Sequence, residues 1–147
     1  MSITHQPLKI VVVEDSDEDY DTVQQAAKQA GLSVVFHRAV TGDECLDLLR
    51  NPALPRPAMV LMDLNTAGTD GRETLAHIKL DQALRDVPVI VFTTSNNPRE
   101  LQFCYAAGAN AYHVKPVRYS EHLALLALIF SYWLNSVILP DSKRQAP

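Results

Sequence analysis

The residues of this chain that are best suited to chemistry stand at the ends of short apolar runs. Glu14 and Asp15 follow KIVVV, Asp63 follows MVLM, Thr93 ends VIVFT and Lys115 follows AYHV. Clustered carboxylates repel one another, and a hard cation such as Mg²⁺, which prefers oxygen ligands, relieves that repulsion. Such a cation could offset the charge of a phosphoryl group that Asp63 attacks as a nucleophile, while Lys115 and the Thr93 hydroxyl contact the phosphoryl oxygens. Brought together, these side chains would accept a phosphoryl group on an aspartate.

The apolar runs predict the elements that must position these side chains. Runs rich in β-branched residues predict strands at residues 8–13, 33–37, 58–62, 87–93 and 111–114. Apolar residues at helical spacing predict helices at residues 17–31, from 41 to the break at NPALPRPA, 73–84, 97–108 and 120–136. We therefore expect the α/β class, as a flavodoxin-like (βα)5 doubly wound parallel sheet with strand order 2-1-3-4-5. Sites in such sheets lie beyond the carboxyl ends of the strands, which is where the residues above would meet.

Size and charge limit the classes of function. The 147 residues, 47% of them hydrophobic, fit a single globular domain. The formal net charge of −4 argues against nucleic acid as the partner, because phosphate binding needs clustered Lys and Arg. The sequence shows neither a signal-peptide pattern nor an apolar run of about 18 residues. We therefore expect a cytoplasmic protein that does not enter a membrane.

Several polar residues have simpler interpretations than chemistry. Cys45 and Cys104 lie far apart on apolar helical faces, which favours two small buried side chains over a disulfide or a metal site. The five histidines show no ligand spacing, which favours structural or surface roles. Asp17, Glu18 and Asp19 open a helix, where negative charge suits the helix dipole, and are expected to form a cap and a solvated turn.

Four motifs in order, VVVEDSDED, LMDLNTAGTDG, VIVFTTS and AYHVKPV, resemble the receiver domains of two-component response regulators. The resemblance implies a receiver domain at residues 7–138, with tails at 1–6 and 139–147. It implies that Asp63 accepts a phosphoryl group from a phosphohistidine on a sensor kinase or a phosphotransfer protein. It also implies Mg²⁺ held by Asp15, Asp63 and the backbone carbonyl of Asn65, with Glu14 holding ligand waters.

The resemblance also implies a switch. Thr93 would be the switch hydroxyl, Lys115 the phosphate-contacting lysine, and Tyr112 the aromatic side chain that changes rotamer on phosphorylation. Asn65 and Ser95 occupy the positions that tune attack of water on the phosphoryl group. The Lys115–Pro116 peptide bond is expected to be cis.

A finer resemblance links the chain to the small single-domain regulators that partner bacterial and cyanobacterial phytochromes. The stretches DGRETLAHIK, VFTTSNNPREL and FSYWLNSVILP carry it. With no effector domain after residue 136, output would come from protein–protein contacts or a phosphorelay. The chain departs from the family pattern at Thr66-Ala67, where Leu-Pro is usual, and loss of the proline would loosen the loop near the metal-binding carbonyl.

The expected last helix is apolar on more than one side. One stripe is formed by Leu123, Leu126, Phe130, Trp133 and Val137, and a second group by Leu125, Leu128, Ile129 and Tyr132. A peripheral helix needs only one apolar face, so the surplus predicts a self-association or partner surface. A twofold homodimer would be the default form of self-association. The alternative is that the C-terminal extension of the chain covers the second face.

Two other functions fit part of the pattern. MDLNT resembles the nucleophile motif of haloacid-dehalogenase-type Mg²⁺-dependent phosphatases, in which Asp63 would again be the nucleophile. That motif needs a second acid where this chain has Asn65, and its metal-binding acids follow the nucleophile strand. A flavodoxin-type flavin mononucleotide binder would need hydroxyls and amides in the loop after the first strand, where EDSDED repels phosphate. We therefore expect a phosphoacceptor signalling protein and not an enzyme, apart from its part in its own phosphorylation and dephosphorylation.

Overall fold

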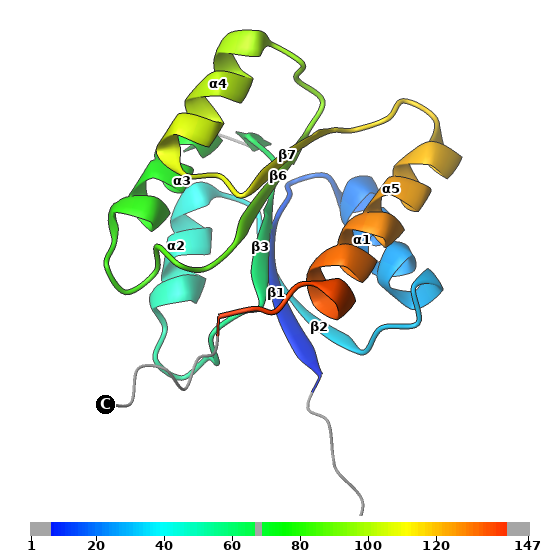
Figure 1. Cartoon of the computed structure of the whole chain (residues 1–147), viewed down its shortest axis with the longest axis horizontal. Helices are drawn as coiled ribbons and strands as arrows, with labels where there is room; N and C mark the ends of the chain where they lie inside the picture. The colour runs from blue at the N-terminus through cyan, green and yellow to red at the C-terminus, as the bar shows by residue number, and fades with distance from the viewer. Residues whose placement is uncertain (1–6, 67–68, 141–147) are drawn as a thin grey trace, which may run out of the picture.

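The computed structural model describes residues 7–66 and 69–140, which form one parallel sheet with helices on both faces (Figure 1). The strands run in the order β2-β1-β3-β6-β7, which confirms the predicted class and strand order. Their bounds are β1 Leu8–Val13, β2 Val34–Ala39, β3 Met59–Met62, β6 Val89–Thr93 and β7 Ala111–Val114. The helices are α1 Asp17–Gln29, α2 Gly42–Arg50, α3 Gly71–Leu80, α4 Pro98–Ala107 and α5 Tyr119–Ser131, followed by a π-helical turn η1 Tyr132–Ser136.

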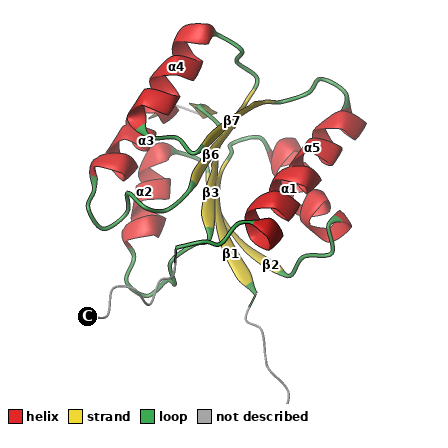
Figure 2. Ribbon diagram, viewed as in Figure 1, coloured by secondary structure: helices red, strands yellow, loops and turns green. Residues whose placement is uncertain are grey.

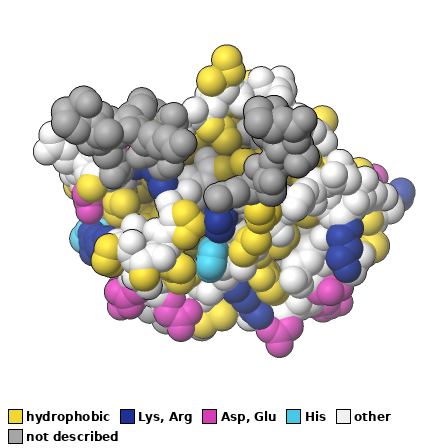
Figure 3. Space-filling model, turned by 90° about the horizontal axis from the view of Figure 1, so that it is seen from below, with side chains coloured by type: hydrophobic (Ala, Val, Ile, Leu, Met, Phe, Trp, Pro, Cys, Tyr) yellow, Lys and Arg dark blue, Asp and Glu magenta, His cyan; other side chains and the backbone are white. Residues whose placement is uncertain are grey.

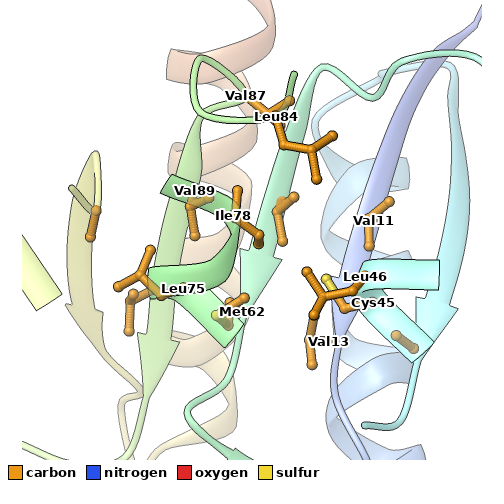
Figure 4. Close-up of a cluster of buried hydrophobic side chains, with 14 of the residues drawn as sticks. Val11, Val13, Cys45, Leu46, Met62, Leu75, Ile78, Leu84, Val87 and Val89 are labelled. Carbon is orange, nitrogen blue, oxygen red and sulfur yellow. The ribbon is translucent and has the colours of Figure 1, made fainter. Parts of the chain in front are cut away.

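The sheet separates two hydrophobic cores. Helices α1 and α5 cover one face, and α2, α3 and α4 cover the other (Figure 2). Successive side chains of a strand point to opposite faces, so Ile10 and Val12 pack into the core under α1 and α5 while Val11 and Val13 pack into the other. Figure 4 shows this second core, in which Val11 and Val13 lie near Cys45 and Leu46 of α2.

Polar caps set the ends of most helices where the sequence predicts them. The N-caps of α1, α2 and α4 are Ser16, Thr41 and Asn97, whose side-chain oxygens each accept a backbone N–H of the first turn. Helix α4 ends at Gly108, whose φ of 111° is a left-handed conformation that favours glycine.

The predicted end of the third helix at residue 84 is wrong. Helix α3 ends at Leu80, because Asp81 adopts an extended backbone and turns the chain away from the helix. The side-chain oxygen of Asp81 accepts the N–H of Ala83 at 2.9 Å, which stabilises this turn. An aspartate that bonds its own backbone competes with helix continuation, and here the turn wins.

A two-stranded hairpin that the sequence did not predict follows the central strand. It pairs β4 Asn65–Thr66 with β5 Thr69–Asp70, while Ala67 and Gly68 lie outside the described residues. Gly71 closes the hairpin, and its N–H donates to the Leu64 carbonyl at 3.0 Å. A Cβ on Gly71 would lie 2.6 Å from Leu64 Cα, so only glycine fits this close approach.

The last helix buries most of the apolar stripe predicted for it. Leu126 and Phe130 are fully buried and Trp133 packs partly against the same core. Of the second apolar group, Ile129 is buried, but Leu128 and Tyr132 are 66% and 54% exposed. The apolar surplus of this helix is therefore real but smaller than the sequence suggests.

Among the described residues, no helix is both long and apolar enough to cross a membrane. The face seen in Figure 3 mixes hydrophobic side chains with basic and acidic ones.

Candidate functional site

The carboxyl edge of the sheet brings together the side chains selected from the sequence. Glu14 follows β1, Asp63 follows β3, Thr93 ends β6 and Lys115 follows β7, and all four are buried. Backbone hydrogen bonds extend the strand pairing by one residue at these positions. The N–H of Glu14 donates to Ala39 at 2.9 Å, that of Asp63 to Val13 at 3.0 Å and that of Lys115 to Thr93 at 2.7 Å. The functional side chains thus stand on a fixed backbone.

The centre of the site is the ammonium group of Lys115. Its Nζ donates to Glu14 Oε1 at 2.7 Å, to Asp19 Oδ2 at 2.8 Å and to Asp63 Oδ2 at 2.9 Å. The Lys115 side chain is only 4% exposed. An ammonium group has three N–H donors, so all of them are used.

Two pKa values in this cluster are shifted upward, for different reasons. Burial would lower the pKa of Lys115, but hydrogen bonds to Asp19 and Glu14 and the charge of Asp63 outweigh it and raise the pKa. Burial raises the pKa of Glu14, and its hydrogen bond and charge interaction with Lys115 offset only part of that effect. Three carboxylates face one ammonium, so the site keeps an excess of negative charge when all are ionised.

Asp63 is held through both of its carboxylate oxygens. Oδ1 accepts the backbone N–H of Asn65 at 3.1 Å, and Oδ2 accepts from Lys115. The side chain is 10% exposed, which leaves it at the mouth of the site and not in the core. A carboxylate with fixed oxygens at the mouth of a site is suited to attack on a small electrophile.

Thr93 and Tyr112 are connected through Ser95. The Thr93 hydroxyl oxygen accepts the side-chain amide of Asn65 at 3.4 Å and the backbone N–H of Ser95 at 3.5 Å, which are long and weak contacts. The Tyr112 hydroxyl donates to the Ser95 carbonyl at 2.9 Å. Both residues predicted to act in the switch therefore contact the loop that follows β6.

The predicted metal ligands follow strands β1 and β3 but are not gathered around a metal site. Among residues 7–66 and 69–140, no three His, Cys, Asp or Glu side chains are grouped so that they could hold an ion. Asp15 is exposed, and the ammonium of Lys115 lies between Glu14 and Asp63. Carboxylates and a backbone carbonyl still match the ligand preference of Mg²⁺, and the ammonium shows that this pocket accommodates a cation. The donor chemistry fits a divalent cation that would compete with Lys115 for the carboxylates.

The sequence interpretation missed two residues of this region. Asp19 was expected to lie in a solvated turn, but its carboxylate binds Lys115. Arg38, at the end of β2, donates through Nε to the Glu14 carbonyl at 2.9 Å and pairs with Asp17 at 2.7 Å. The signal available for both was their position, because the first turn of α1 and the end of β2 lie at the same edge of the sheet as Glu14.

Other expectations about individual residues have clear outcomes. Cys45 and Cys104 are buried and free, as predicted, and burial raises their thiol pKa values to about 12 and about 11. His122 is buried against Phe92 at 5.1 Å between ring centroids, which confirms a structural position for this histidine. The expected cis Lys115–Pro116 bond is wrong, since no peptide bond in the described residues is cis. The trans form is the more stable one for most X–Pro bonds.

Comparisons with known proteins point to one family of similar chains. A family model described as response regulator receiver domain matches residues 10–127. Response regulator Rcp1 of Synechocystis sp. is 34% identical over 141 residues, which cover 91% of this chain and 94% of that protein. The crystal structure of the phosphorylated cyanobacterial phytochrome response regulator RcpA superposes with a TM-score of 0.88 at 31% identity, covering 92% of this chain and 100% of that one. The Mn²⁺-bound form of Rcp1 gives 0.86 at 33% identity, with coverage of 92% and 100%.

Proposed function

The chain belongs to the family of response regulator receiver domains, and on this premise we propose that it signals by carrying a phosphoryl group on Asp63. One observation carries the proposal: the Asp63 carboxylate stands at the carboxyl end of the central strand, 2.9 Å from the Lys115 ammonium. We place the receiver domain at residues 7–138, a range that contains the family match at 10–127. The family match leaves the haloacid-dehalogenase alternative without support.

The proposed transfer is a displacement at phosphorus. An oxygen of Asp63 forms a bond to phosphorus while the bond from phosphorus to a histidine nitrogen of the donor breaks, and its electron pair leaves with the imidazole. Lys115 would release Asp63 Oδ2 and donate a hydrogen bond to a phosphoryl oxygen. The Thr93 hydroxyl would donate a hydrogen bond to another phosphoryl oxygen. Positioning and charge compensation are what such a transfer needs most from a protein.

We propose that the cation of this site is Mg²⁺. Asp15, Asp63 and the backbone carbonyl of Asn65 would hold it, with Glu14 acting through ligand waters. When bound, it would supply positive charge against the phosphoryl oxygens. The hard oxygen donors support this choice, and the Mn²⁺-bound form of the similar protein Rcp1 supports a divalent cation in general.

We propose that phosphorylation shifts the loop after β6. Among the described residues, the Thr93 hydroxyl has only long contacts, so a phosphoryl oxygen would be a better partner for it. Movement of Thr93 would carry Ser95 with it and break the hydrogen bond that Tyr112 donates to the Ser95 carbonyl. Tyr112 would then change rotamer, and the surface around α4 and β7 would change with it.

We propose a sensor histidine kinase of the phytochrome type as the phosphoryl donor, directly or through a phosphotransfer protein. The similarity to Rcp1 and to the phytochrome response regulator RcpA supports this partner. The protein would act in the cytoplasm as a phosphoacceptor, take part in its own phosphorylation and dephosphorylation, and have no other enzymatic activity. Its output would pass through protein–protein contacts or a phosphorelay, without nucleic acid binding.

We propose a homodimer formed through the C-terminal helix. Leu128 and Tyr132 are exposed there, and with Trp133 and His113 they line a groove of about 460 Å³. Leu128→Glu is expected to halve the mass measured by light scattering, because it places a charge in the apolar contact. Leu80→Glu is the matched control, since Leu80 is 85% exposed on α3, and it should leave the mass unchanged. A monomer mass measured for the wild-type protein would refute the dimer.

The phosphoacceptor assignment is tested with acetyl phosphate and Mg²⁺. Intact mass spectrometry should show one added phosphoryl group on the wild type and none on Asp63→Asn. Asp70→Asn is the matched control, because Asp70 lies in the same loop but pairs with Arg72 outside the cluster. Equal labelling of wild type and Asp63→Asn would refute the assignment.

A further inference from the structure

Asp19 is the third carboxylate of the cluster, and it comes from a different element than its partners. Its Oδ2 accepts from Lys115 Nζ at 2.8 Å across a separation of 96 residues. The Asp19 side chain is 33% exposed, compared with 6% for Glu14 and 10% for Asp63. Asp19 therefore holds the solvent side of the ammonium, while Glu14 and Asp63 hold its buried side.

The cap of α1 shows that the carboxylate of Asp19 is not needed by its own helix. Ser16 caps the helix by accepting the backbone N–H of Asp19 at 3.2 Å. In a capping box, the side chain at the position of Asp19 would accept the N–H of the cap residue in return. Here Glu14 Oε2 accepts the Ser16 N–H at 3.2 Å instead. The backbone of Asp19 is thus fixed by the cap while its carboxylate is free to reach Lys115.

In this arrangement, the Lys115 ammonium and a divalent cation compete for the same carboxylates. Every N–H of the ammonium is used, so a divalent cation that binds Asp63 must compete with Lys115 for that carboxylate. Asp19 lies outside the proposed cation ligands, so it is a partner that the ammonium keeps when it gives up Asp63 to the cation. It also adds a negative charge close to those ligands. Both effects favour a divalent cation at the site over the ammonium.

We propose that Asp19 is a positioning residue that anchors Lys115 to α1 and so raises the affinity of the site for a divalent cation. The inference rests on the proposed function, because it concerns the same site. After Asp63 is phosphorylated, Asp19 and Glu14 keep two N–H groups of Lys115 in place while the third turns to a phosphoryl oxygen. Asp19 thereby keeps the lysine from swinging into solvent.

The test compares Asp19→Asn with Glu18→Gln in the full chain. Each removes one negative charge from the first turn of α1, but Glu18 is exposed and only Asp19 is in the Lys115 cluster. Titration calorimetry with Mg²⁺ should show affinity about three- to tenfold weaker for Asp19→Asn, and within about twofold of wild type for Glu18→Gln. Asp19→Glu, which keeps the charge, should restore the wild-type affinity.

A spectroscopic readout follows Lys115 itself without any cation. In ¹⁵N NMR, the ammonium signal of wild-type Lys115 should be visible because three acceptors protect it from exchange with water. In Asp19→Asn the signal should broaden or vanish, and in Glu18→Gln it should persist. Wild-type signal and affinity in Asp19→Asn would overturn the inference. Failure of acetyl phosphate to label the wild type would overturn the proposed function instead, so the two failures are distinguishable.

Discussion

Two lysines lie at opposite ends of the sheet, and each uses all of its N–H donors in a different way. Lys115, after β7, binds three carboxylates. Lys79, on α3, donates to the backbone carbonyls of Arg85 at 3.0 Å and Val87 at 2.9 Å and to the side chain of Asn110 at 3.0 Å. Val87 precedes β6 and Asn110 precedes β7, so these contacts are at the amino edge of the sheet.

The difference in partners separates a functional lysine from a structural one. Neutral acceptors satisfy Lys79 without compensating its charge, and burial lowers its pKa. The carboxylates around Lys115 raise its pKa and leave negative charge in excess. Lys79 completes the hydrogen bonds of two loops and has no charged partner that a ligand could replace. Lys115 lies among carboxylates and can release one of them when a phosphoryl group or a cation binds.

The two lysines should differ most when each ammonium is removed in turn and phosphorylation is measured. Lys115→Met should slow labelling by acetyl phosphate about 100-fold, because a charged donor to the phosphoryl oxygens is lost. Lys79→Met, the same change at the other edge, should leave the rate within about twofold of wild type. Quantitative mass spectrometry over time measures both rates. Equal slowing by the two substitutions would mean that Lys115 acts only through the fold.

Stability should respond to Lys79. Lys79→Met leaves two carbonyls with one partner fewer, so we expect the free energy of unfolding to fall by about 2 kcal/mol. Urea unfolding followed by circular dichroism measures it. Lys28→Met, on the last turn of α1 and outside both lysine networks, is the control and should be within about 0.5 kcal/mol of wild type. A loss as small for Lys79→Met as for the control would contradict the structural role.

A neighbouring glycine tests the Lys79 network from its other side. A Cβ on Gly108 would lie 2.9 Å from Lys79 Cγ, and the φ of Gly108 is 111°. Gly108→Ala should therefore cost about 1 to 2 kcal/mol of unfolding free energy, from backbone strain and displacement of the lysine stem. Gly31→Ala shares the positive φ but meets nothing within 4 Å, so it isolates the backbone part of that cost. Equal losses in the two variants would show that Lys79 is not displaced.

The smallest expected effect is the pH dependence contributed by His122, which lies behind Phe92 at the Lys115 end. Burial lowers the pKa of His122 below its ordinary 6.5, the charge of Asp19 opposes this and that of Lys115 adds to it. The unfolded chain then takes up the proton at a higher pH than the folded chain, so stability falls as the pH drops below about 6.5. His122→Phe should reduce that fall by less than about 1 kcal/mol between about pH 7 and about pH 5.5.

Urea unfolding at each pH measures the slope for His122→Phe. His77→Phe, at an exposed position on α3, is the matched control for the loss of an imidazole. A wild-type slope in His122→Phe would show that this histidine does not titrate differently in the two states.

The parts of the molecule that follow local rules could be predicted from the sequence. The apolar runs predicted every end of the five strands to within two residues. Because parallel strands end at the same edge of the sheet, their ends also brought Glu14, Asp63, Thr93 and Lys115 to one edge. Asn97, Pro98 and Gly108 marked the two ends of α4 because caps act within a few residues.

The remaining features depend on contacts between residues far apart in sequence or on local patterns too short to recognise. The contact between Asp19 and Lys115 joins residues far apart in sequence, and the acidic first turn of α1 does not by itself show which carboxylate reaches across the fold. The hairpin β4–β5 is too short to show a strand pattern. The end of α3 at Leu80 depended on a single aspartate turn, whose gain over one more helical turn is small.

The absence of a side chain at Gly71 has a mechanical consequence. Because the first residue of α3 packs against the backbone of Leu64, no compressible layer separates that helix from the residue next to Asp63. A displacement of the strand end by a few tenths of an ångström would push on α3 by direct steric contact. The helix would move as a rigid body, on the opposite face of the sheet from α1, whose Asp19 binds Lys115.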